Sequence, residues 1–418
     1  MGKIKRFWKN LGPGLITGAS DDDPSGIATY AIAGAKTGQA SLWTMLYSLP
    51  LMFVLQEMSA RIGIVSKCGL AGNIKRYYPR FLLAIIAVVI VSSNIFNIGA
   101  DVSGMAAAIE LLIPNSSNFT APILILVILF LIVVLRYRKI ASIFKWFSFS
   151  LLVYVIAGFI AIDNWPSIIF HTFVPTIRFT KEYATILLAI LGTTISPYLA
   201  VWQASEEAEE QRLKYGPREK ICEVTTVTKN ELKHAHDDTL GGMLFSNIIA
   251  IFIIALSSSV LFQAGARNIE TIKEAAQTLQ PLAGNYAYLL FTVGLISSGL
   301  LAIPVLAGSA AYVLAEIFGW EASLDEPFSK AKQFYLVIIF AAGIGLAMNY
   351  IGLNPIKALF YTAILQGMAG PILIGTMLHM ANNSDIVGEH KNSLTSNILG
   401  YTTMFLMIGA SVAFFFTL

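Results

Sequence analysis

Charged side chains are scarce in this sequence. Only 13% of its 418 residues are Asp, Glu, Lys or Arg, and 56% are hydrophobic, whereas an ordinary soluble domain is about 25% charged. This composition excludes a large soluble enzyme, in which short apolar strands alternate with amphipathic helices. It indicates an all-α protein that crosses a membrane many times.

Cysteine is nearly absent as well. The chain has 2 cysteines, Cys68 and Cys222, which match no metal-site spacing, and we expect both to be reduced thiols in cytoplasmic loops. The sequence also lacks a Gly-x-x-x-x-Gly-Lys-Ser/Thr loop, a catalytic constellation and the symmetric filter loops of a channel. These absences argue against an ATP-driven pump, a membrane enzyme and an ion channel. No cofactor and no nucleic-acid partner are expected.

The sequence does contain a long series of apolar runs that could each cross a lipid bilayer. We predict eleven spans, near residues 11–38, 41–66, 81–113, 119–136, 141–163, 182–205, 238–264, 283–317, 332–351, 355–381 and 394–417. With the N-terminus inside, 22 Lys and Arg residues fall on the inner side and 6 on the outer side. Because basic loops stay in the cytoplasm, we expect a multi-pass protein of a bacterial plasma membrane with a cytoplasmic N-terminus.

Two of the predicted spans contain an irregular stretch. The first span carries GASDDDPSGI around Pro24, and the sixth carries GTTISPY around Pro197. Each span opens one group of five helices, so the two prolines occupy corresponding positions in two halves of the chain. Broken helices at matching positions are typical of secondary transporters built from inverted repeats, because freed backbone groups are tolerated in a membrane only beside a cavity or ion.

Three consecutive carboxylates, Asp21, Asp22 and Asp23, precede the first of these prolines. A charged side chain at mid-membrane costs at least about 2.5–3.5 kcal/mol and is treated first as a functional group. We predict that Asp23, directly before the proline, binds a cation between the two broken helices. Asp21 and Asp22 either face an aqueous vestibule or proton path, or cap the ends of helices.

Other polar side chains in or near the spans have more than one interpretation. Glu57 and Arg61, four residues apart, predict an internal ion pair or a gate. In the tenth span three side chains compete for a place in a cavity: Tyr361, Thr362 and Gln366. The polar interval 206–238 is expected to be a solvated cytoplasmic loop. Its acids are either a solvated face or a vestibule that attracts cations, and its histidines are a possible metal-sensing cluster; these residues are Glu206, Glu207, Glu209, Glu210, His234 and His236.

Three stretches resemble the NRAMP divalent-metal transporters. GPGLITGASDDDPSGIATYAIAGAKTG resembles the first helix of that family, whose hallmark is Asp-Pro-Gly-Asn, and LLAILGTTISPYLAVWQAS resembles its sixth, whose hallmark is Met-Pro-His. LQEMSARIGIVSKCGLAG resembles the second helix and the loop after it. The resemblance covers most of the chain and implies a LeuT-like fold of two inverted five-helix repeats, 1–163 and 182–381, plus an eleventh helix, 394–418.

The sequence departs from the family pattern at the metal ligands. Asp23 and Pro24 are kept, but Gly26 replaces the family's metal-binding Asn, and Ser196 replaces its metal-binding Met. The resemblance implies a metal site made by Asp23, Ser25, Gly26, Thr193 (through its carbonyl or hydroxyl) and Ser196. This pattern resembles the NRAMP-related magnesium transporters. Thioether sulfur selects soft transition metals, whereas Mg²⁺ prefers carboxylates and retained water.

The positions that the family uses to move protons also differ. Tyr198 replaces one family His, and Gln203 lies where a second is expected. In the third helix Asp101 is kept, while Asn97 or Ile98 fills the second acidic position. We therefore expect alternating-access transport of Mg²⁺ and Mn²⁺ with weak or no proton coupling. The alternatives are a proton-coupled Mn²⁺ or Fe²⁺ importer and an amino-acid transporter of the same fold.

Overall fold

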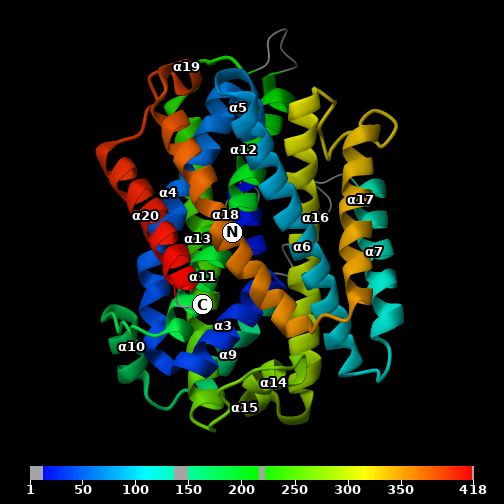
Figure 1. Cartoon of the computed structure of the whole chain (residues 1–418), viewed down its shortest axis with the longest axis vertical. Helices are drawn as coiled ribbons and strands as arrows, with labels where there is room; N and C mark the ends of the chain where they lie inside the picture. Colours follow the sequence, from blue (N-terminus) through cyan, green and yellow to red (C-terminus); the bar gives the residue numbers. More distant parts are fainter. Residues whose placement is uncertain (1–12, 136–148, 216–221, 417–418) are drawn as a thin grey trace, which may run out of the picture.

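The computed structural model describes residues 13–135, 149–215 and 222–416, and all regular elements within these ranges are helices (Figure 1). Nine stretches of the described residues are long and apolar enough to cross a membrane. One of them holds two helices, α3 (Pro24–Thr37) and α4 (Leu42–Ser66), and a shorter apolar stretch covers Phe149–Ala161. The described helices therefore correspond, in order, to the eleven predicted spans, although residues 141–148 of the fifth predicted span lie outside the described part of the chain.

The other long or spanning helices follow in chain order: α6 (Arg80–Glu110), α7 (Ser117–Val134), α9 (Leu152–Ala161), α11 (Lys181–Thr194), α12 (Pro197–Tyr215), α13 (Lys229–Ser257), α16 (Ala287–Phe318), α17 (Lys332–Met348), α18 (Pro355–Asn382) and α20 (Leu394–Phe416). Short helices lie at the two ends of the bundle (Figure 1): α5 (Leu70–Tyr77) and α19 (Ser384–Val387) at one end, and α10 (Trp165–Phe173), α14 (Ile272–Ala276) and α15 (Gln280–Ala283) at the other.

The first span is broken at the predicted place. Helix α2 (Pro13–Asp21) ends before Asp22 and Asp23, and α3 begins at Pro24. A residue before proline is pushed out of the helical region, and Asp23 has extended backbone angles (φ −67°, ψ 171°). Its side chain caps α3 by accepting a hydrogen bond from the Gly26 N–H, so the break is built by the Asp-Pro pair itself.

The sixth span is broken in the same way. Helix α11 ends at Thr194, Ile195 and Ser196 separate the two halves, and α12 begins at Pro197. Ile195 has non-helical backbone angles (φ −118°, ψ 52°). Both predicted breaks are therefore present, each with a proline as the first residue of its second half-helix.

Glycines bring the helices of the interior into close contact. Helix α13 packs against α2 and α3, and α18 packs against α11. A Cβ atom added to Gly18 would lie 2.2 Å from the carbonyl carbon of Gly242, and one added to Gly192 would lie 1.9 Å from the carbonyl oxygen of Ala363. Small residues allow such backbone contacts between membrane helices, and here they hold both broken spans inside the bundle.

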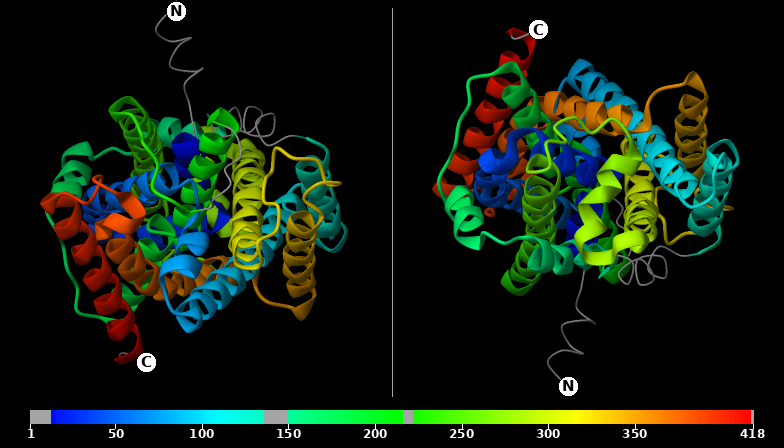
Figure 2. Two further views of the ribbon diagram at one scale, coloured as in Figure 1. Left: turned by 90° about the horizontal axis from the view of Figure 1, so that it is seen from above. Right: turned by 90° about the horizontal axis from the view of Figure 1, so that it is seen from below.

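The outer helices expose apolar side chains to the surroundings. Helix α20 lies on the opposite side of the bundle from α7 and α17 (Figure 2). Phe405 on α20, Phe130 on α7 and Phe340 on α17 are each more than 60% exposed. Apolar exposure of this kind fits contact with lipid rather than water. The broken helices α2, α3, α11 and α12 occupy the interior, where most of their residues are buried.

The prediction of a solvated loop over 206–238 is wrong at both of its ends. Helix α12 continues to Tyr215, and α13 already begins at Lys229. The predicted spans ended where apolar residues give way to charged ones. Helix α12 continues past that point because neighbouring helices cover its acids, and α13 begins earlier, with a capping box between Thr228 and Glu231. Only the middle of the interval connects the two helices, and residues 216–221 lie outside the described part of the chain.

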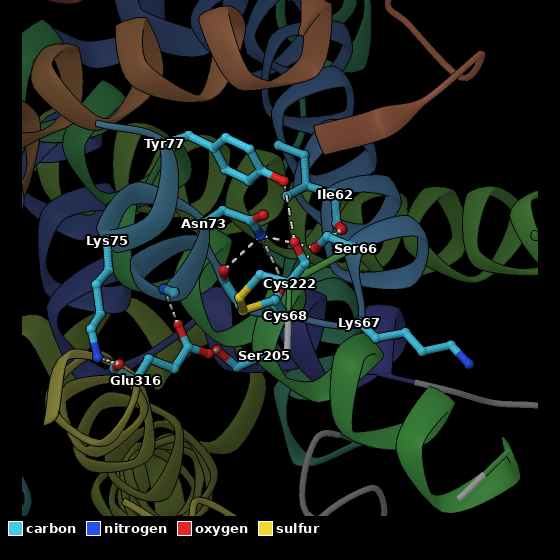
Figure 3. Close-up of a disulfide and its surroundings, with 12 residues drawn as sticks. Ile62, Ser66, Lys67, Cys68, Asn73, Lys75, Tyr77, Ser205, Cys222 and Glu316 are labelled. Carbon is cyan, nitrogen blue, oxygen red and sulfur yellow. Dashed lines mark hydrogen bonds between the residues drawn. A yellow bond between two sulfur atoms is a disulfide. The ribbon is translucent and has the colours of Figure 1, made fainter. Parts of the chain in front are cut away.

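The prediction of two reduced thiols is also wrong. Cys68 and Cys222 form a disulfide across 154 residues, with their Cα atoms 5.0 Å apart (Figure 3). The bond joins the turn between α4 and α5 to the segment that leads into α13. Sequence spacing alone could not indicate this pairing, because it depends on the path of the chain between α12 and α13.

Candidate functional site

The Asp23 carboxylate is buried at the centre of the first break. One oxygen, Oδ1, accepts hydrogen bonds from the Ser25 hydroxyl and the Gly26 N–H, each at 2.7 Å. The other oxygen, Oδ2, accepts a bond of 3.0 Å from the side-chain amide of Asn97 on α6. Among the described residues no basic side chain forms an ion pair with Asp23. Three donors therefore fix the position of the carboxylate, and no described Lys or Arg is paired with it.

The two broken spans meet at this carboxylate. The position of a Cβ atom on Gly26 lies 3.1 Å from the Thr193 hydroxyl of α11 and 3.4 Å from Asp23 Oδ1. The Tyr198 hydroxyl, on α12, donates a hydrogen bond of 3.1 Å to the backbone carbonyl of Ser20. The sequence predicted that these segments converge, and they do. A glycine at position 26 therefore lets Thr193 approach the carboxylate, where a Cβ atom would be in tight contact with both.

Ser196 lies in the second break, but its hydroxyl already has partners. It donates to the backbone carbonyls of Thr193, at 2.7 Å, and Gly192, at 3.0 Å. The oxygen keeps its lone pairs, and the side chain lines a small cavity together with Gln56 of α4 and Leu373 of α18. Ser196 can therefore offer a hydroxyl oxygen, or hold a water, at the end of α11.

Asp101 faces the same centre from α6. It is fully buried, and neither of its carboxylate oxygens has a hydrogen-bond partner. It interacts electrostatically with Asp23. Asn97, one helical turn earlier, is the side chain that contacts Asp23, whereas Ile98 packs among apolar side chains. The open choice between Asn97 and Ile98 in the sequence therefore resolves to Asn97 as the residue at the site.

Asp21 and Asp22 turn away from Asn97 toward α13. Both carboxylates lie near the Ser246 hydroxyl, at 2.7 Å from Asp21 Oδ2 and 3.2 Å from Asp22 Oδ1. Both side chains are fully buried, so neither faces a wide aqueous vestibule. Sequence reasoning missed Ser246. The sequence feature that could have identified it is its position beside Asn247 within the apolar part of α13, since buried polar residues of membrane helices mark functional sites.

Gln203 lies too far along α12 to join the Asp23 site. Its side-chain amide donates to Glu207 at 2.9 Å, and its carbonyl accepts from the Thr17 hydroxyl of α2. These groups form a separate buried polar contact between α2 and α12. Glu57 and Arg61 make the predicted ion pair, at 3.4 Å, and Arg61 also contacts Asn392.

Of the acidic run after the sixth span, Glu206, Glu207 and Glu209 are buried, and Glu210 is exposed. Glu206 and Glu209 are buried, and both accept hydrogen bonds from the hydroxyl of Tyr312 on α16. Glu209 also accepts one from Ser323. Tyr312 was not predicted from the sequence, because its contact depends on how α16 packs on α12. The acids therefore stabilise a helix contact instead of lining an open mouth.

The candidates of the tenth span divide between the two faces of α18. Tyr361 is 57% exposed on the outer face, so it lines no internal cavity. Thr362 and Gln366 are buried, and their side-chain polar atoms have no hydrogen-bond partner. Helix α18 packs against α3. Of the three candidates, only Thr362 and Gln366 can face the interior.

The two histidines at the start of α13 form no metal cluster. Within the described ranges no group of three or more His, Cys, Asp and Glu side chains is placed to hold a metal ion. His234 lies exposed at the start of α13, and the ring of His236 packs edge-on against Phe53. A cation at Asp23 would therefore be held by fewer than three such side chains, together with neutral oxygens.

Three comparisons relate the chain to known proteins. A family model described as natural resistance-associated macrophage protein-like (Nramp) matches residues 14–417. The divalent metal cation transporter MntH of Caldanaerobacter subterraneus subsp. tengcongensis is 24% identical, across 100% of this chain and 95% of that protein. The MntH of Mesorhizobium japonicum is 28% identical, across 71% and 65%. These relatives are transporters and not enzymes.

Solved structures show the fold. A manganese transporter of Eremococcus coleocola superposes with a TM-score of 0.75 at 18% identity, over 99% of this chain and 87% of that one. MhsT, solved with L-phenylalanine, superposes with a TM-score of 0.64 at 10% identity, over 97% and 98%. The LeuT-like fold predicted from the sequence is therefore confirmed.

Proposed function

Since the chain belongs to the Nramp family, we propose that it is a transporter that carries divalent metal cations across the membrane by alternating access. The observation that carries this proposal is the place of Asp23, a buried carboxylate that pairs with no described basic side chain and lies where two broken helices meet. Freed backbone groups beside such a carboxylate form an oxygen-rich site at the depth of the membrane where a transporter binds its substrate.

We propose Mg²⁺ and Mn²⁺ as the transported ions. The groups bonded to Asp23 are the Ser25 hydroxyl, the Gly26 N–H and the Asn97 amide, and the Thr193 hydroxyl lies beside Gly26. None of these groups is a thioether, and soft sulfur ligands are what favour transition metals over Mg²⁺. Mg²⁺ keeps several of its waters and is usually held by one or two carboxylates. Mn²⁺ accepts the same oxygen ligands.

We also propose that transport is not coupled to protons. Asn97, an amide that cannot carry a proton between sites, contacts Asp23 directly. Tyr198 is bonded to the Ser20 carbonyl, and Gln203 belongs to the separate contact with Glu207. Asp101 is the buried acid that favours the alternative, a proton-coupled Mn²⁺ or Fe²⁺ importer. Its involvement would be revealed by acidification of the vesicle interior that depends on the metal.

The arrangement in the membrane completes the proposal. The Lys and Arg distribution favours a cytoplasmic N-terminus in a bacterial plasma membrane. We propose that residues 1–163 and 182–381 are the two inverted repeats that move against each other, with residues 394–418 as the additional helix. The corresponding breaks at Pro24 and Pro197 support this division.

The test is metal uptake into proteoliposomes with a simultaneous reading of internal pH. We expect wild type to take up Mg²⁺ and Mn²⁺ without a change in pH, and Asp23→Ala to lose uptake of both ions. Asp163→Ala, which removes an exposed carboxylate between α9 and α10, is the matched control and should transport as wild type does. Full uptake by Asp23→Ala would refute the site. Acidification abolished by Asp101→Asn would refute uncoupled transport.

A further inference from the structure

A cavity of about 250 Å³ lies between the end of α6, the start of α7 and the link from α17 to α18. Helices α6, α7 and α17 pack against one another, and α6 reaches α14 at this end of the bundle (Figure 1). A single buried water needs only about 10–15 Å³, so the cavity has room for a polyatomic group. The residues that line it come from all three segments and include Ala107, Glu110, Ser117, Asn118, Asn349 and Leu353.

The acidic side chain in this cavity has no partner within the described part of the chain. Glu110 is partly buried at the last turn of α6, and it forms no ion pair or hydrogen bond with a described residue. The side-chain amide of Asn349 donates to the carbonyls of Gly99 and Gly345, so its oxygen remains as an acceptor. These two lining groups accept hydrogen bonds, and they therefore suit a positively charged donor such as a primary ammonium group.

The start of α7 has the opposite electrostatic character. Ser116 precedes this helix without making a side-chain cap, and the N–H groups of a first helical turn have no partner within the helix. Ser117 and Asn118, the first two residues of α7, line the cavity. Such helix ends attract anionic oxygens, including those of phosphate. A lone anion would share the cavity with Glu110, and a lone cation would share it with the start of α7, so a zwitterion fits both.

The surroundings place the cavity at the edge of the lipid layer. It lies where the third and fourth predicted spans end, and Tyr350, which also lines it, is 60% exposed, as is typical of aromatic side chains at headgroup level. Leu353 in its wall and Phe119, one residue after Asn118, are 48% and 73% exposed. A molecule in the cavity would therefore continue over outward-facing apolar side chains, which favours a phospholipid over a soluble zwitterion.

We propose that this cavity binds the headgroup of a phospholipid with a primary amine, of the phosphatidylethanolamine type. The ammonium group binds Glu110 and the side-chain oxygen of Asn349, the phosphate lies at the start of α7, and the acyl chains lie on Leu353 and Phe119. Glu110 follows Asp101 by about two and a half helical turns, so it lies on the opposite face of α6 from the Asp23 site. The proposed site is therefore independent of the proposed metal transport.

Native mass spectrometry of the purified full-length chain tests this proposal. The chain in detergent is mixed with equal amounts of phosphatidylethanolamine, phosphatidylcholine and phosphatidylglycerol that have the same acyl chains. We expect wild type to retain phosphatidylethanolamine roughly tenfold better than the other two, because choline has no N–H to donate and glycerol has no positive charge. Glu110→Gln should lose this preference. Asp163→Asn, which changes an exposed carboxylate between α9 and α10, is the matched control and should keep it.

A second variant, Ala107→Leu, fills the cavity and leaves the carboxylate in place. It should also lose the preference, and it decides the question if Glu110→Gln does not fold. Equal retention of the three lipids by wild type overturns the proposal, and so does a preference that survives in either variant.

Phosphoethanolamine, which is the headgroup without acyl chains, distinguishes the two possible sources of a zwitterion. We expect it to leave the bound lipid in place at equal concentration. If it displaces the lipid there, the cavity belongs to a soluble zwitterion and the lipid assignment is wrong. Failure of the proposed function gives a different result, because it appears as normal metal uptake by Asp23→Ala, whatever lipid the chain retains.

Discussion

At the scale of single residues, Asp23 shows how a short sequence places a charge inside a membrane. Pro24 forces the residue before it out of the helix, and the freed Gly26 N–H then binds the Asp23 carboxylate. Ser25 and Asn97 add two more donors. The same residues therefore break the helix and position the carboxylate. An acid elsewhere in a span would have neither the break nor the donors.

Selectivity is the first property that one residue should change. Ser196→Met would place a soft sulfur at the end of α11, where a hydroxyl now lies. We expect the half-saturation concentration for Mn²⁺ and Cd²⁺ uptake to fall relative to that for Mg²⁺ by roughly tenfold, about 1.4 kcal/mol. Competition in liposome uptake measures it. Ser411→Met on the outer helix α20 is the control and should leave the ratio unchanged. An unchanged ratio in Ser196→Met would place the ion away from the second break.

Some site residues could be predicted from the sequence and others could not. The two breaks and Asp23 were predictable because proline and a buried acid have local physical consequences. Ser246 and Tyr312 were missed because their importance comes from partners more than 90 residues away in the chain. The exposed position of Tyr361 was also not predictable. Tyr361, Thr362 and Gln366 cannot all face inward, and the rotation of the helix about its own axis, which decides between them, is set by packing against its neighbours.

At the scale of helices, close glycine contacts decide how the broken spans are held. Gly192 of α11 lies against Ala363 and Gly367 of α18, where an added Cβ would approach the backbone to 1.9 Å and 2.5 Å. Backbone at that distance cannot move aside as a flexible side chain can. The helices themselves would have to separate, which would displace Thr193, one residue further along α11, from Gly26.

We therefore expect Gly192→Ala to destabilise the protein by about 1–3 kcal/mol, the typical cost of overpacking an interior, and to lower metal uptake. Gly294→Ala on α16 is the control, because nothing lies within 4 Å of its added Cβ; it should be neutral or stabilising by up to about 1 kcal/mol. Thermal unfolding in detergent, together with uptake, measures both variants. A Gly192→Ala protein as stable as wild type would mean that α11 and α18 can separate at no cost.

At the scale of the whole molecule, the eleven spans, their order and both breaks were predicted from apolar length and proline position. The ends of α12 and α13 were not, because tertiary packing buries Glu206 and Glu209 where the sequence alone indicates solvent. The pairing of Cys68 with Cys222 was missed for the same reason. The apolar residues of a segment determine whether it spans the membrane, but the residues at which its helix begins and ends also depend on the packing of neighbouring helices.

The orientation of the molecule gives a prediction of its own. Lys391, after α19, and Lys357, near the start of α18, are both exposed and lie in segments predicted on opposite sides of the membrane. In intact cells, a membrane-impermeant maleimide should label Lys357→Cys and not Lys391→Cys, and lysis should make both reactive. Cys68 and Cys222 are buried in a disulfide and should give little background. The reverse labelling pattern would place the N-terminus outside.

The disulfide should contribute to global stability. It closes a separation of 154 residues, and a crosslink over a long loop typically stabilises by about 2–4 kcal/mol. We expect Cys68→Ser, Cys222→Ser and reduction of wild type to lower the thermal midpoint by the same amount, measured in detergent. Reductant should have no further effect on either variant. A wild-type midpoint that does not respond to reduction would contradict a stabilising bond.

The same bond has a mechanical consequence. On one side it holds the end of α4, and on the other it holds the segment after α12, while Ser205 of α12 and Gly72 of α5 both contact Glu316 of α16 (Figure 3). At this end of the molecule the disulfide therefore limits how far the end of α4 can move away from the segment after α12. A thiol reductant would remove this limit.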